Sequence, residues 1–123
     1  MPTRTNRSAR AAGTRHETSI ATYLAQQLQD DRIERRSLNG RNDRGDVAGV
    51  RAWGQRVVIE CKSQARHSLA EWLDEAEVER GNDDALVGII VFKRRGTTDP
   101  NEQYVLMSGA SLIALLTGER PTT

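Results

Sequence analysis

Cysteine, aromatic residues and long apolar runs are scarce in this chain of 123 residues. The single cysteine, Cys61, excludes an intrachain disulfide, so nothing in the sequence indicates an oxidising compartment. Aromatic residues make up only 4%, which argues against the aromatic stacking platforms that bind single-stranded nucleic acid. No apolar segment approaches transmembrane length, and the first residues lack the apolar core of a signal peptide. We therefore expect a cytoplasmic protein without a membrane partner.

The net charge of +1 hides an uneven distribution of charged residues. Residues 1–56 carry eleven arginines and six acids, whereas residues 57–123 carry seven basic residues and eleven acids. A chain with one basic half and one acidic half suits a phosphate-rich partner that approaches from one side. Residues 1–13 contain three arginines and no acid, and we expect them to form a flexible basic arm.

Apolar periodicity predicts a single domain over residues 14–118. Thr14 followed by Glu17 is a capping-box pattern, which predicts a helix that ends near residue 31. Ser68 followed by Glu71 predicts a second helix, whose acidic face we expect to be solvated, and a final apolar helix is expected over 108–118. Strands are predicted at 32–38, 46–51, 56–62, 85–93 and 103–107, with a loop at 39–45. This order is typical of an α/β sandwich in which helices flank a mixed central sheet.

The chemically informative residues lie at the end of the predicted strand 56–62. Side chains alternate along a strand, so Glu60 and Lys62 point to the same face. The apolar residues before them indicate a central strand, where charges are costly unless they are paired or bind a metal. Asp46 opens the neighbouring strand of the expected hairpin and reaches the same edge. Two carboxylates and an amine are therefore expected to converge.

Phosphodiester hydrolysis needs such a set of groups. Carboxylate oxygens are the ligands that Mg²⁺ prefers, and a bound metal polarises the phosphate and activates a water molecule. An amine beside it orients the nucleophile or stabilises the charge that develops on the phosphate.

The spacing of these residues resembles the PD-(D/E)xK nuclease signature, because Asp46 is followed by thirteen residues and then by Glu60-x-Lys62. The resemblance extends over roughly residues 14–107, and includes an upstream helix with a glutamate, Glu17. Gly45 stands where the signature has proline. Within that superfamily, the small size and the early Glu17 resemble archaeal-type and phage Holliday junction resolvases.

The resemblance implies a restriction-endonuclease-like α/β sandwich and a metal-dependent endonuclease that cuts branched DNA, foremost Holliday junctions. It implies Glu17, Asp46, Glu60 and Lys62 as catalytic residues. It also implies a metal site of Asp46, Glu60, the Cys61 carbonyl and Glu17 for Mg²⁺, with Mn²⁺ as a substitute. The basic residues near this site in the sequence are candidates for contacts to DNA: Arg15, Arg41, Arg44 and Arg66.

The implied partner is branched or double-stranded DNA, and the implied assembly is a homodimer, because resolving a four-way junction requires paired cuts. The location is the host cytoplasm if the chain is phage-encoded. The apolar helix over 108–118 offers an interface, although core packing explains it equally well. The alternatives are another nuclease of this superfamily, of repair or restriction type, and a catalytically inactive DNA-binding module of the same fold.

Each candidate residue also has a purely structural interpretation. Glu60 and Lys62 could form a salt bridge on an edge strand, and Asp46 could be a turn residue. Glu17 could complete the capping box with Thr14 instead of belonging to the site. Cys61 is expected to be a core residue rather than a nucleophile. Lys93, Arg94 and Arg95 follow a predicted strand and could contact phosphate or lie in a solvated loop.

Overall fold

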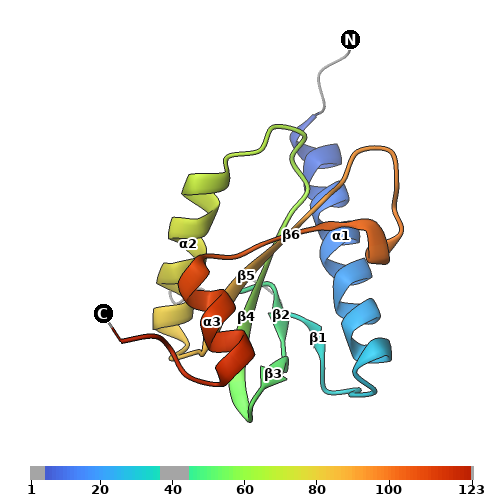
Figure 1. The fold of residues 1–123 in the computed structure, drawn as a ribbon. Helices are drawn as coiled ribbons and strands as arrows, with labels where there is room; N and C mark the ends of the chain where they lie inside the picture. The colour runs from blue at the N-terminus through green and yellow to red at the C-terminus, as the bar shows by residue number, and fades with distance from the viewer. Residues whose placement is uncertain (1–4, 37–44, 123) are drawn as a thin grey trace.

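The central sheet is mixed and has the strand order β1-β2-β4-β5-β6 within residues 5–36 and 45–122, which the computed structural model describes (Figure 1). A sixth strand, β3 (Arg51–Ala52), pairs only with β4. The β4–β5 pair is parallel, and every other pair is antiparallel. The strands of the main path are β1 (Glu34–Arg35), β2 (Val47–Ala48), β4 (Gln55–Lys62), β5 (Val87–Phe92) and β6 (Tyr104–Leu106).

Three α-helices flank this sheet in the described ranges: α1 (Asn6–Gln27), α2 (Leu69–Asn82) and α3 (Gly109–Thr117). Helices α1 and α3 pack on one face, because Ile20 and Ala114 share a core cluster with Ile59 and Val91. Helix α2 packs on the other face, where Trp72 and Ala76 meet Ile90 and Phe92. The layers confirm the predicted mixed sheet between helices.

The predicted central strands are confirmed. Strand β4 lies third of five along the sheet, and residues 57–61 are buried. All six residues of β5 are buried, as a continuous apolar run predicts for a strand covered on both faces. The predicted hairpin forms, since Val47 pairs with Ile59, and β3 and β4 are joined through Trp53 and Gly54 with φ values of 58° and 73°. The single strand predicted at 46–51 is wrong, because the left-handed backbone at Gly49 divides it into β2 and β3.

Helix α2 approaches β5 closely at Gly88. A Cβ atom at this position would lie 2.8 Å from the carbonyl oxygen of Ala76, closer than packed atoms allow. The absence of a side chain at Gly88 therefore determines how near α2 lies to the sheet. This matters for function because α2 carries acidic residues towards the end of β4.

The predicted start of the first helix is wrong. Helix α1 begins at Asn6, and Thr5 is its N-cap, whose Oγ1 accepts a hydrogen bond from the Ser8 amide at 3.1 Å. Residues 6–13, expected to form a flexible arm, are helical. Alanine and arginine between residues 9 and 12 favour a helix, and the single Gly13 costs only about 1 kcal/mol, too little to end it. Thr14 and Glu17 therefore lie inside the helix and form no capping box.

The other helices match their predicted positions more closely. Ser68 is the N-cap of α2 by position, but within the described residues its side chain makes no capping hydrogen bond, so the expected capping box with Glu71 is not formed. Helix α3 begins after Ser108, whose hydroxyl accepts from the Ser111 amide, and ends at Gly118 with φ 85°.

None of the helices within the described ranges is both long and apolar enough to cross a membrane. The loop predicted at 39–45 falls mostly on residues 37–44, which lie outside the described residues, as do Arg41 and Arg44.

Candidate active site

Three of the predicted residues meet where β4 ends. Glu60 and Lys62 are both on β4, and the Lys62 Nζ lies 3.6 Å from Glu60 Oε1. Asp46 immediately precedes β2, the antiparallel neighbour of β4, and its Oδ2 accepts a hydrogen bond from the Cys61 amide at 2.8 Å. Asp46 and Glu60 are only 5% and 7% exposed. Glu60 is not a surface residue of an edge strand, so the alternative of a surface ion pair on an edge strand does not apply, whereas Asp46 does lie at a bend directly after Gly45.

The Lys62 amine is held by a residue that the sequence analysis did not single out. Its Nζ donates a hydrogen bond to Glu75 Oε2 of α2 at 2.7 Å. Burial lowers the pKa of Lys62, but the hydrogen bond to Glu75 and the charges of Glu60 and Asp46 outweigh it, so the pKa is raised overall. Lys62 is therefore a protonated amine at neutral pH, suited to stabilise negative charge and not to act as a base.

Glu60 also has an acidic neighbour on α2, namely Glu79. Burial raises the pKa of Glu60 to about 10, together with its hydrogen bond to Glu79 and the nearby charges of Asp46 and Glu79, against an opposing effect of Lys62. Two buried carboxyls form a hydrogen bond only if one of them carries a proton. Glu60 Oε2 is buried and receives no hydrogen bond from any donor in the described residues. At neutral pH the pair therefore retains a proton, or a cation takes its place.

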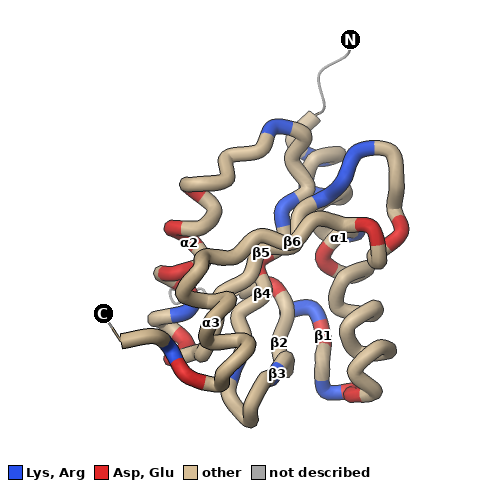
Figure 2. The backbone as a smooth tube through the Cα atoms, in the orientation of Figure 1, with Lys and Arg blue, Asp and Glu red and all other residues tan. Residues whose placement is uncertain are grey.

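The face of the second helix opposite its apolar stripe is exposed at Glu71, Asp74 and Glu77, as predicted, but two further acids, Glu75 and Glu79, are not solvated. Glu79 is 6% exposed, and Glu75 is half-buried against Lys62. Figure 2 shows the acidic residues distributed along α2 beside the sheet. The sequence did contain a signal, because Glu79 lies seven residues after Trp72 and three after Ala76, on the same stripe that packs against the sheet.

Cys61 belongs to the core on the opposite face of the sheet. Burial and the charges of Asp46, Glu17 and Glu60 raise the pKa of its thiol, so it is not a nucleophile at neutral pH. This confirms the expectation of a core cysteine. His16 is buried on the same side, and its Nε2 donates to the Val91 carbonyl oxygen at 2.9 Å, while burial lowers its pKa.

Glu17 lies on α1, where it contacts β1, and its charge contributes to the raised pKa of Cys61. Its Oε2 accepts a hydrogen bond from Arg35 Nη1 at 3.2 Å. The charges that shift the pKa of Glu60 are those of Asp46, Glu79 and Lys62. A catalytic role for Glu17 stays a prediction, although its alternative role as a helix cap is excluded by the start of α1. The candidate DNA contacts Arg15 and Arg66 are both exposed.

Gly45 explains the departure from the signature. Its φ is 95°, and a Cβ there would lie 2.9 Å from the Ile59 carbonyl oxygen. Proline, whose φ is fixed near −65°, cannot adopt this conformation. The backbone before Asp46 therefore follows a path that only glycine accommodates without strain.

The donor set fits a hard divalent cation that keeps its own water. No three histidine, cysteine or acidic side chains form a metal-binding group within residues 5–36 and 45–122. Mg²⁺ commonly takes only one or two carboxylates from the protein and completes its shell with water and phosphate oxygens. Asp46 and the unsatisfied oxygen of Glu60 supply that minimum, whereas a structural zinc site would need four protein ligands.

Comparison of the chain with known protein families, with characterised proteins and with solved structures finds no match.

Proposed function

We propose that this chain is a metal-dependent endonuclease of the PD-(D/E)xK type that hydrolyses phosphodiester bonds in branched DNA, foremost Holliday junctions. The observation that carries the proposal is the cluster of Asp46, Glu60 and Lys62, which is held at the end of a central strand by neighbouring backbone and side chains. Buried acids that lie close together are costly and persist where they bind a ligand. The αββββαββα order is compatible with the restriction-endonuclease-like fold that the proposal requires.

The cluster divides the chemistry among its members. Asp46 is anchored by the Cys61 amide, so one of its oxygens is fixed and the carboxylate has a defined orientation. Glu60 presents a buried oxygen that accepts no hydrogen bond in the described residues, and Mg²⁺ held by these two carboxylates would polarise a bound phosphate and activate a water molecule. The Lys62 ammonium would donate hydrogen bonds to the phosphate oxygens, and its positive charge would stabilise the negative charge that develops on them.

Glu75 determines where the Lys62 amine lies before substrate arrives. The 2.7 Å hydrogen bond to Glu75 keeps the Lys62 Nζ at the cluster. When a phosphate oxygen displaces Glu75, the amine is therefore already positioned to donate to it. Glu75 is a positioning residue in this account, since it acts through Lys62.

A homodimer is part of the proposal, because two opposed cuts require two sites. The surface that supports it is apolar and exposed: Val105 of β6 is 58% exposed, and Leu116 of α3 is 64% exposed. Leu112 and Ile113, which are also on α3, are each 45% exposed.

The test is a cleavage assay of the full chain on a four-way junction, a linear duplex and a single strand, with and without Mg²⁺. We expect the junction to be cut only with Mg²⁺. Asp46→Asn should reduce the rate by about two decades or more, equivalent to roughly 3 kcal/mol of transition-state stabilisation. Its amide oxygen can still accept from the Cys61 amide, so the fold is preserved.

The matched control is Asp74→Asn, the same change at an exposed position on α2, which should leave cleavage unchanged. Preferential cleavage of the linear duplex would support a nuclease but show that its substrate is duplex rather than branched DNA. Absence of metal-dependent cleavage of all three substrates would refute the proposal and favour an inactive DNA-binding module.

A further inference from the structure

A cavity of about 410 Å³ lies on the α1 side of the sheet, beyond the ends of the parallel strands β4 and β5. Its walls come from three separate parts of the chain. Helix α1 contributes Arg15, His16 and Ser19, the residue after β4 contributes Ser63, and the residue after β5 contributes Lys93. In open α/β sheets, ligands bind beyond the carboxyl ends of the parallel strands, which is where this cavity lies. Its volume is in the range of small-molecule sites.

The lining of the cavity has the chemistry of an anion site. Arg15 and Lys93 bring two positive charges, Ser19, Ser63 and Thr98 bring three hydroxyl groups, and no acidic residue is among the described residues that line it. A guanidinium, an ammonium and hydroxyl donors together match the oxygens of a phosphate group.

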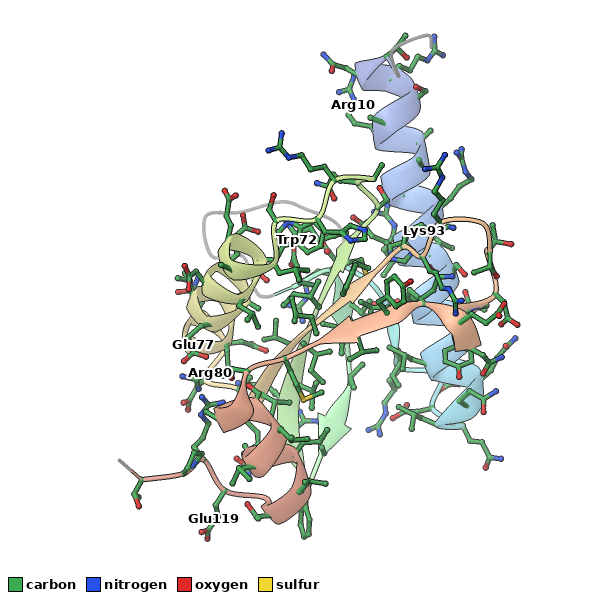
Figure 3. All side chains as sticks on the ribbon, turned by 45° about the horizontal axis from the view of Figure 1, so that its top comes forward. Arg10, Trp72, Glu77, Arg80, Lys93 and Glu119 are labelled. Carbon is green, nitrogen blue, oxygen red and sulfur yellow. The ribbon has the colours of Figure 1, made fainter. Side chains whose placement is uncertain are left out.

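Among the described residues, Lys93 is held in position by carbonyl oxygens and has no carboxylate partner. Its Nζ donates hydrogen bonds to the carbonyl oxygens of Arg94, at 2.7 Å, and of Thr97. The side chain of Gln103 fastens the same loop by donating to the carbonyl oxygens of Thr97 and Asp99. Because carbonyl partners leave the ammonium charge uncompensated, that charge remains available to an anion. Figure 3 shows Lys93 beside α1, at the boundary between the helix and this loop.

The cavity is connected to the candidate active site through the backbone. Ser63 directly follows Lys62, and the Lys93 amide donates to the Lys62 carbonyl oxygen at 2.9 Å. The acidic cluster lies on the α2 face of β4, and the cavity lies on its α1 face. A nucleic-acid strand that crosses the end of β4 would therefore meet the cleavage cluster and this basic cavity in succession.

We propose that this cavity binds a phosphate group of the nucleic-acid strand, either an internal phosphodiester or a terminal phosphate, next to the site of cleavage. The inference rests on the proposed nuclease function for the identity of the strand, although phosphate binding itself can be measured without any cleavage. Arg15 and Lys93 provide the charge, and the three hydroxyl groups provide neutral donors.

The first experiment titrates the full chain with inorganic phosphate and follows backbone amide NMR shifts, with sodium chloride at equal ionic strength as reference. We expect the shifts to concentrate at residues 12–19, at 63 and at 93–98. Arg15→Gln should weaken phosphate binding about tenfold. Arg15 is exposed on α1, so this variant keeps the fold. Lys93→Gln is the second variant and should have a similar effect.

The matched control is Arg10→Gln, which removes the same charge from an exposed position on α1 that does not line the cavity (Figure 3). It should change phosphate affinity by less than twofold. Shifts no larger than those with chloride, or an equal loss of affinity in the Arg10 and Arg15 variants, would overturn the proposal.

The second experiment separates the two sources of phosphate with three short oligonucleotides of one sequence, ending in a 5′-phosphate, a 3′-phosphate or hydroxyl groups only. Tighter binding of one phosphorylated strand assigns the cavity to a terminal phosphate. Equal binding of all three, each weakened by Arg15→Gln, assigns it to an internal phosphodiester. Binding that Arg15→Gln does not weaken overturns the proposal. A chain that binds phosphate here but cuts no DNA refutes the proposed function alone, and a chain that cuts DNA without binding phosphate here refutes this inference alone.

Discussion

Replacing Glu60 by glutamine should stabilise the folded protein at neutral pH when no divalent metal is present. The folded carboxyl keeps its proton up to about pH 10, whereas a carboxyl with the ordinary pKa of 4.5 releases it. Folding therefore takes up a proton between these two values, and the free energy of unfolding of the wild type falls as the pH rises through this window. Glutamine has nearly the same shape, carries no charge at any pH and can donate its amide to Glu79.

The size of this stabilisation follows from the free energy of keeping Glu60 protonated at pH 7. At pH 7 the carboxyl is held protonated about 2.5 pH units above its ordinary pKa, and each unit corresponds to 1.36 kcal/mol. The cost to folding is about 3 kcal/mol, which is the upper limit for the gain from Glu60→Gln. Glu60 and Glu79 share this proton, so the cost belongs to the pair.

The assay is urea unfolding of wild type and Glu60→Gln in EDTA between pH 5.5 and 8.5. We expect the difference in unfolding free energy to grow by at most about 1.4 kcal/mol for each pH unit, because groups remote from Glu60 cancel whereas Glu79 and Lys62, which interact with it, titrate differently in the variant. The control is Val78→Thr on the exposed side of α2, which changes no ionisable group, so its difference from wild type should not depend on pH. A difference between wild type and Glu60→Gln that stays constant across this range would refute the protonated Glu60.

Four further changes test the remaining assignments. Glu79→Gln removes a like charge beside Glu60, so the pH of half-maximal cleavage should move to lower values, and an unmoved profile would contradict their coupling. Lys62→Gln should reduce the cleavage rate by about two decades while DNA affinity in gel-shift assays changes only a few-fold. Glu17→Gln should reduce turnover by about two decades and stability by less than about 1 kcal/mol; wild-type turnover at limiting Mg²⁺ would remove Glu17 from the site. Gly45→Ala should lower the free energy of unfolding by about 1–3 kcal/mol in urea titrations, and a neutral effect would contradict the left-handed backbone before Asp46.

The position of β4 could be predicted from the sequence because its signals are local. An apolar run that ends in two charged residues two positions apart indicates a buried strand with chemistry at its end. Pairing with β2 then follows from the short connection through Trp53 and Gly54, which brings Asp46 to the same end. The separation of Glu60 and Lys62 from Cys61 onto opposite faces likewise needed only the alternation of side chains.

The start of α1 could not be predicted from a local pattern, because Thr5 and Thr14 are both suitable N-cap residues. Thr14 with Glu17 has the better capping pattern, yet Thr5 is used, since the alanines and arginines between them favour a longer helix. The choice depends on the summed preference of a whole segment and on packing against the end of β4, where Gly13 lies near Ser63. Neither quantity is visible in the capping pattern alone.

The acids of α2 were missed for a different reason. Their periodicity gives the angle between side chains around the helix, but it does not give the rotation of the helix relative to the sheet. Trp72 and Ala76 define that rotation, and extending their stripe by one turn includes Glu79. An acid on an apolar stripe looks like an error in the pattern until its partner on the facing strand is known.

The close approach at Gly88 has a consequence for variation in this protein. The helix that rests on this glycine carries two of the carboxyl groups that hold Glu60 and Lys62, so its height above the sheet determines both separations. A single added methyl group at position 88 would lift α2 and alter the spacing of four ionisable groups without contacting any of them. Substitutions at this uncharged position are therefore constrained by the electrostatics of a distant cluster.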